Sequence, residues 1–148
     1  MSLKNRIQDD MKAAMRARAK DRLAAIRLIM AAVKQREVDE RITLDDAQVI
    51  AVLERMLKQR RESIAQFERA GRDDLVAKET FELDLIQSYM PEALSEAEIE
   101  ALIDSAIAAT SAQSMRDMGK AMVYVKERAQ GRADMSVVSA RLKSRLAG

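Results

Sequence analysis

Residues 88–100 read SYMPEALSEAEIE, and this stretch divides the chain into two parts. Pro91 is the only proline of the sequence. Because the residue before a proline disfavours helical backbone, a helix that precedes it must end by Met90. Ser95 and Glu98 have the S-x-x-E spacing of a capping box, which predicts that a new helix begins directly after Ser95. The stretch therefore predicts a domain boundary at residues 90–94.

The composition predicts that both parts are helical. Of the 148 residues, 48% are hydrophobic, 34% are charged and only 3% are aromatic, and there are four glycines. Such a composition favours long helices over sheet, with a core made of Leu, Ile, Val, Met and Ala. No alternation of apolar and polar residues persists over the length of a strand. We expect an all-α fold.

Apolar spacing and helix-terminal residues predict seven helices. Four of them form an N-terminal helical subdomain at residues 1–91, and three form a C-terminal helical subdomain at residues 92–148. In the first subdomain, we expect Thr43 to cap the third helix and Gly71 to end it as the left-handed C′ residue. In the second, Ser114 repeats the capping pattern and is expected to begin the sixth helix.

The residue types exclude several kinds of active site. The sequence contains no cysteine and no histidine, so thiolate catalysis, the commonest general base and the commonest metal ligand are all absent. The acidic residues lie mainly in the first turns of predicted helices, where the helix dipole favours them. There is no P-loop and no nucleophile elbow. We therefore expect no catalytic residue, no cofactor and no metal site.

The hydropathy pattern predicts the cellular compartment of the protein. The stretch from Met1 to Ile7 is too polar for a secretory signal. No run approaches the ~20 apolar residues that a membrane span requires. We expect a cytoplasmic protein without a membrane partner.

Charge is distributed unevenly, although the formal net charge is only +2. Residues 1–36 contain ten Lys or Arg and three acidic residues, and residues 111–148 contain eight and three. Residues 92–110 contain five acidic residues and no Lys or Arg. Blocks of one sign often become patches on the folded surface. The alternative is that these blocks are ordinary solvated helix faces.

Arg60 falls at a heptad position of the third helix that is otherwise apolar. An arginine at such a position either extends its stem to solvent or pairs with an acidic residue in the groove between the subdomains.

The segment of residues 114–134 combines a helix glycine with several cations. Gly119 costs up to ~1 kcal/mol against alanine in a helix, which indicates that another backbone approaches the helix surface there. Lys120, Lys126 and Arg132 can place positive charge around that surface, as phosphate-binding residues do. The alternative, equally compatible with the spacing, is that Gly119 only lets two helices of the protein pack closely.

Several strings of the sequence resemble the YqeY-like family, and together they extend over nearly the whole chain. The resemblance implies two helical subdomains, of which the second is similar to the C-terminal tail of the B subunit of tRNA-dependent glutamine amidotransferases. The strings are Asp117-Met118-Gly119-Lys120-x-Met122, Gly131-Arg132-Ala133-Asp134, Lys58-Gln59-Arg60-Arg61 and Tyr89-Met90-Pro91.

In that enzyme the tail is similar to a tRNA-docking appendage, and its amidase and kinase parts have no counterpart in this sequence. The resemblance therefore implies a non-catalytic tRNA-binding or adaptor module, associated with carbon–nitrogen ligase activity that uses glutamine as the amide donor. The alternative is a protein-interaction module that docks on an amidotransferase or an aminoacyl-tRNA synthetase without binding RNA. The expected RNA-binding residues are Arg116, Gly119, Lys120, Lys126 and Arg132.

Overall fold

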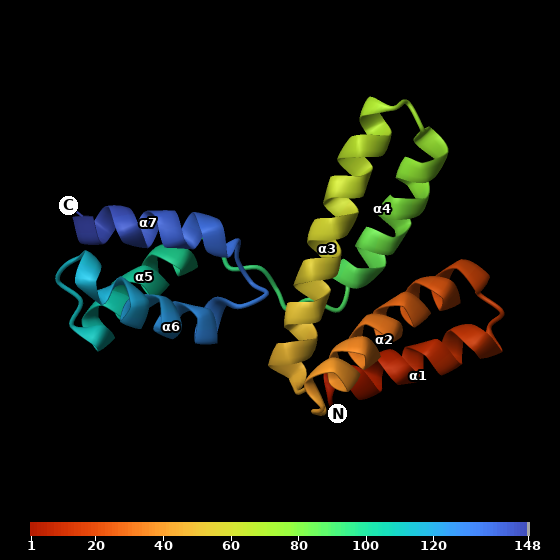
Figure 1. The fold of residues 1–148 in the computed structure, drawn as a ribbon, viewed down its shortest axis with the longest axis horizontal. Coiled ribbons are helices and arrows are strands. Elements are labelled where there is room, and N and C mark those ends of the chain that lie inside the picture. The colour runs from red at the N-terminus through yellow and green to blue at the C-terminus, as the bar shows by residue number, and fades with distance from the viewer. Residues whose placement is uncertain (148) are drawn as a thin grey trace. The chain divides into compact units, whose positions relative to one another are not determined.

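The structure, a computed structural model, describes residues 1–147 and is built from helices (Figure 1). No strand occurs in this part of the chain, so the predicted all-α fold is confirmed. The elements are α1 (Leu3–Arg16), α2 (Lys20–Glu40), α3 (Asp46–Arg69), α4 (Asp73–Gln87), α5 (Glu96–Thr110), a 3₁₀ turn η1 (Met115–Asp117), α6 (Met118–Ala129) and α7 (Met135–Ala147).

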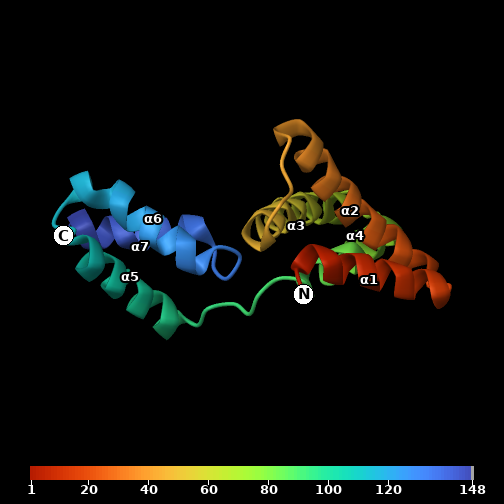
Figure 2. The same cartoon turned by 90° about the horizontal axis from the view of Figure 1, so that it is seen from below.

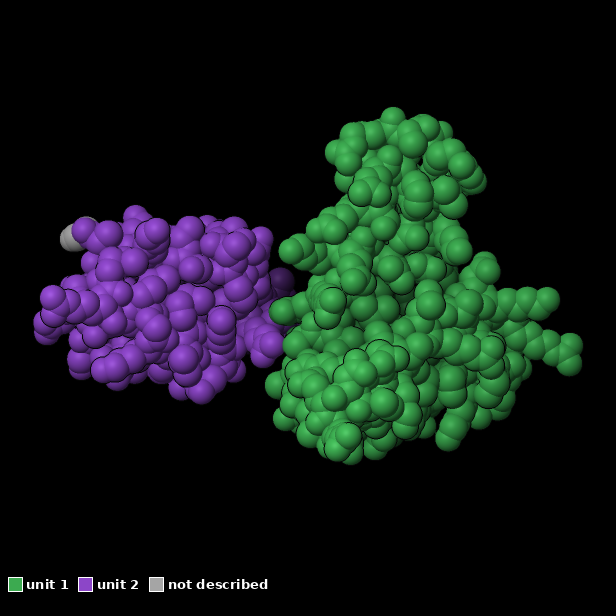
Figure 3. All heavy atoms as spheres, in the orientation of Figure 1, with its two compact units in different colours: residues 1–90 green, residues 91–148 purple. Residues whose placement is uncertain are grey.

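The helices form two compact units (Figure 3). Each unit has its own hydrophobic core. The first unit is Met1–Met90, with α1 to α4, and the second begins at Pro91 and contains the remaining helices. No helix within residues 1–147 is both long enough and apolar enough to cross a bilayer.

The first unit consists of two helical hairpins, in which α1 packs along α2 and α3 packs along α4 (Figures 1 and 2). Its core is formed by fully buried Ile and Leu side chains, among them Ile26, Ile29 and Leu53. Burying each such side chain stabilises the fold by about 1.5–3 kcal/mol.

Both hairpins turn through the same backbone motif. After α3, Gly71 has φ +69° and the Arg72 N–H donates to the Phe67 carbonyl, which confirms Gly71 as the C′ residue. After α1, Arg18 takes the same left-handed place with φ +55°, and the Ala19 N–H donates to the Ala14 carbonyl.

The start of α3 differs from the prediction. The N-cap is Asp45, whose carboxylate accepts the Gln48 N–H while the Gln48 amide oxygen accepts the Asp45 N–H. Thr43 is not the cap, because α3 begins at Asp46 and the capping box formed by Asp45 and Gln48 closes directly before it. The Asp46 carboxylate itself accepts the Leu3 N–H.

In the second unit, α5, α6 and α7 enclose a core centred on Ile103, Val125 and Leu142. The predicted capping box at the start of α5 is present, with Ser95 accepting the Glu98 N–H. Ser114 also forms a capping box, but it caps the single turn η1. The α-helix itself therefore begins three residues later than predicted.

Candidate nucleic-acid interface

The turn that leads into α6 is held by Asp117. Its carboxylate accepts the N–H groups of Gln113, at 2.9 Å, and of Ser114. The Gln113 N–H is the largest cause of a pKa below the ordinary aspartate value, and the nearby charges of Lys120 and Arg116 lower it further. The carboxylate is therefore ionised at neutral pH, and it orders the chain just before the predicted site.

Gly119 is the second residue of α6 and is exposed. A Cβ atom added there meets no heavy atom within 4 Å. The alternative that Gly119 allows two helices of the protein to pack closely therefore fails within the described chain. The missing side chain instead leaves open space on the surface of α6.

Lys126 lies on the same face of α6 as Gly119, and Lys120 borders that face. Successive α-helical residues are rotated by 100°, so Gly119, Val123 and Lys126 follow one face and Lys120 borders it. Both lysines are exposed, and neither forms an ion pair with any residue between 1 and 147. We call Gly119, Lys120, Val123 and Lys126 the α6 face.

Val123 is the member of the α6 face that sequence reasoning missed. Its side chain is 58% exposed, which is unusual for a valine inside a helix. The signal was available, because Val123 lies four residues after Gly119 and therefore shares its face.

Arg132 has a different role from the one expected. It is only partly exposed, and its Nε donates to the Glu92 carbonyl oxygen at 2.9 Å. The Leu94 N–H in turn donates to the Arg132 carbonyl oxygen at 2.7 Å. Arg132 thus fastens the segment before α5 to the loop after α6. Of the other expected residues, Arg116 lies in η1 and is exposed.

The single aromatic side chain of the second unit is covered by an arginine. The Arg128 guanidinium lies 3.5 Å from the centre of the Tyr124 ring, and its Nη1 donates to the Tyr124 carbonyl. A cation stacked over the ring leaves that ring face unavailable for a nucleobase.

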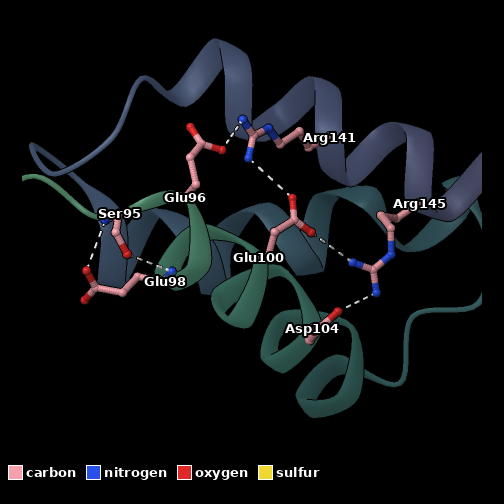
Figure 4. Close-up of polar contacts among 7 residues, drawn as sticks. All are labelled: Ser95, Glu96, Glu98, Glu100, Asp104, Arg141 and Arg145. Atoms are coloured by element: carbon pink, nitrogen blue, oxygen red, sulfur yellow. Dashed lines mark hydrogen bonds and ion pairs between the residues drawn. The ribbon is translucent and has the colours of Figure 1, made fainter.

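Much of the acidic block pairs with the basic block along α5 and α7 (Figure 4). Arg141 bridges Glu96 and Glu100, and Arg145 bridges Glu100 and Asp104. The spacing of four residues on both helices produces this ladder. Exposed pairs of this kind contribute at most about 1 kcal/mol each. Their main effect here is to pair Arg141 and Arg145 with acidic residues, whereas the lysines of the α6 face have no ion-pair partner within the described residues.

Arg60 pairs with acidic residues of its own unit, whereas the expected partner was an acidic residue in the groove between the subdomains. Its Nε is 2.8 Å from a Glu82 carboxylate oxygen and 3.4 Å from one of Glu79, both on α4. All three side chains are largely buried. The arginine therefore joins α3 to α4 and is not available to a ligand.

Three curated relatives of the chain carry the same name. "Altered inheritance of mitochondria protein 41, mitochondrial" from Pyrenophora tritici-repentis is 33% identical over 141 residues, which is 93% of this chain and 77% of the relative. The protein of that name from Eremothecium gossypii is 41% identical over 85 residues, 57% of this chain and 46% of the relative. The one from Saccharomyces cerevisiae (strain YJM789) is 31% identical over 122 residues, 82% of this chain and 65% of the relative. This chain thus covers less than two thirds of the latter two proteins.

These names contradict the expectation of a cytoplasmic protein, because all three relatives are named mitochondrial. The expectation depended on the polar start of the sequence and on the lack of a long apolar run. Neither feature distinguishes the cytoplasm from another aqueous compartment, and the names of the relatives overturn the cytoplasmic assignment.

The family comparison covers almost the entire chain. The family described as "Yqey-like protein" matches residues 4–146, which include α2 to α6 and all but one residue of each of α1 and α7. The strings around Gly119, Gly131, Arg60 and Pro91 all lie within the match. The chain belongs to the YqeY-like protein family.

Proposed function

We propose that this protein is a non-catalytic tRNA-binding or adaptor module that contacts RNA phosphates through the α6 face. The observation that carries the proposal is the pair of exposed, unpaired lysines, Lys120 and Lys126, beside the open surface at Gly119. Flexible ammonium groups beside a position without a side chain allow a phosphate strand to approach the helix closely.

Backbone contact suits this surface better than base recognition. Arg128 covers a face of Tyr124, so an open stacking platform is not offered there. Resemblance to the amidotransferase tail supports tRNA as the ligand, in association with glutamine-dependent carbon–nitrogen ligase activity located on another protein. The printed names of the relatives refer to inheritance of mitochondria and state no molecular activity.

Binding of total tRNA to single variants tests the proposal. We expect Lys120→Ala and Lys126→Ala each to weaken binding several-fold across tRNA species, because each removes one phosphate contact. Lys143→Ala is the matched control, since Lys143 is exposed on α7 of the same unit. Full binding by both α6 variants, or an equal loss in the control, would contradict the proposal.

Gly119→Leu separates shape from charge. The open space at Gly119 and the better helix propensity of leucine predict a fold at least as stable as the native one. The bulk should nevertheless keep a phosphate strand away and weaken tRNA binding. A folded Gly119→Leu variant with native affinity would show that RNA does not approach this face.

Exposure of Val123 favours a second candidate, a protein-docking surface on the same helix. In that case Val123→Ser would abolish capture of an amidotransferase or aminoacyl-tRNA synthetase, while tRNA would not bind at all. Such an interface would also resist salt, whereas phosphate binding weakens steeply as salt rises.

A further inference from the structure

A second cationic cluster lies on the first unit, where α1 turns into α2. Five Lys or Arg occur within eleven residues, and Asp21 is the single acidic residue among them. All five side chains are exposed, and none forms an ion pair within the described chain. We call this cluster the α1–α2 tip; its members are Lys12, Arg16, Arg18, Lys20 and Arg22.

Arg18 has left-handed backbone although it is not a glycine, as do Arg41 and Ser111. Arg18 has φ +55°, a conformation that costs free energy for every residue except glycine. The equivalent position of the other hairpin is Gly71, with φ +69° and the same pattern of hydrogen bonds. The turn itself therefore needs no arginine, and glycine would form it with less strain.

The composition of the tip favours a nucleic-acid duplex over a lipid surface. The exposed residues between the cations include Ala13 and Ala17, and the one large apolar side chain among them is Met15, 46% exposed. A membrane-binding helix carries several Leu, Phe or Trp side chains on its apolar face. Residues 1–36 also contain no aromatic residue, so bases of a single strand have nothing to stack on.

We propose that the α1–α2 tip binds the phosphate backbone of a nucleic-acid duplex without reading its sequence. These cations lie on the last two turns of α1, on the connecting turn and on the first turn of α2, so positive charge is concentrated at one end of the hairpin, as contact with closely spaced phosphates requires. This site lies on a different unit from the α6 face and does not depend on it.

The test measures binding of the full chain to a labelled 20-bp duplex of mixed sequence, prepared once as RNA and once as DNA. The tip variant is Arg16→Gln/Arg18→Gly/Lys20→Gln. Its control, Lys58→Gln/Arg69→Gln/Lys78→Gln, removes the same charge from exposed positions of α3 and α4. We expect the tip variant to bind at least one of the two duplexes about tenfold or more weakly at low salt, with a slope against log salt reduced by about two to three. The control should retain the native slope.

Two further measurements control for loss of folding and for binding through the α6 face. The melting temperature of the Arg18→Gly single variant should equal or exceed the native one, while its duplex binding falls. The loss caused by the tip variant should persist in a Lys120→Ala/Lys126→Ala background, so each site succeeds or fails independently.

Three results would overturn the proposal. The first is native duplex affinity in the tip variant for both RNA and DNA. The second is an equal loss in the α3–α4 control, which would indicate a general charge effect. The third is selective loss of binding to phosphatidylserine-containing vesicles with duplex binding intact, which would assign the tip to a lipid surface.

Discussion

Arg60 is a cation at an otherwise apolar position of α3, held by Glu79 and Glu82 of α4. Replacing it by leucine would leave two largely buried carboxylates without their counter-charge. We expect Arg60→Leu to lower the free energy of unfolding by about 3 kcal/mol, measured by urea denaturation. The neighbouring Arg61 is exposed, so Arg61→Leu should change stability by less than about 0.5 kcal/mol. Equal effects of the two variants would show that the ion pairs do not hold the hairpin together.

Tyr89 joins the end of α4 to α1. Its side chain is buried, and its hydroxyl donates to an Asp10 carboxylate oxygen at 2.6 Å. Burial, followed by this hydrogen bond, raises the pKa of Tyr89 above its ordinary value of 10.

The raised pKa predicts a loss of stability in alkali. The unfolded chain releases the tyrosine proton near pH 10 whereas the folded chain retains it, so this contribution is constant below that pH and is lost as the pH rises. Tyr89→Phe should cost about 1 kcal/mol at neutral pH and should weaken the decline between pH 9 and 11. Parallel stability curves for the native protein and Tyr89→Phe over that range would refute this account.

At the scale of elements, the sequence predicts which helices exist better than where they begin. The number and order of the α-helices follow from apolar spacing, because each helix needs one buried stripe. The predicted starts of α3 and α6 differ from the observed ones by a few residues. Thr43 and Asp45 are both good caps, but only Asp45 is followed three residues later by a residue, Gln48, that closes a capping box. Comparing the two positions for this spacing places the start of α3 correctly.

The capping box of α5 is an element whose loss should affect one unit only. Ser95→Ala removes the acceptor for the Glu98 N–H and should destabilise the second unit by about 1 kcal/mol. Amide hydrogen exchange should speed up in α5 to α7 and stay unchanged in α1 to α4, because the two units have separate cores. Ser105→Ala, at an exposed position inside α5, is the control and should leave exchange unaffected. Faster exchange throughout the chain would mean that the units unfold together.

At the scale of the whole molecule, charge blocks in the sequence predict surface charge only after pairing is known. Most of the acidic residues of α5 pair with Arg141 and Arg145. Neither the acidic block of residues 92–110 nor the basic block of residues 111–148 therefore forms an intact surface patch. Among the expected RNA-binding residues, Gly119, Lys120 and Lys126 are exposed on one side of α6. Arg132 instead donates a hydrogen bond to the Glu92 backbone carbonyl. Helical periodicity predicts the shared side of α6. The hydrogen bond of Arg132 could not be predicted in this way, because it depends on how the loop before α5 folds back.

The central claim is that the α6 face contributes phosphate contacts to tRNA binding, and the salt dependence of affinity tests it most directly. The affinity for total tRNA is measured from low to physiological salt for the native protein and for Lys120→Ala/Lys126→Ala. Two lost phosphate contacts should reduce the slope of log affinity against log salt by about two, with weaker binding at every salt concentration. An unchanged slope and affinity, with Lys143→Ala as the reference, would contradict the claim.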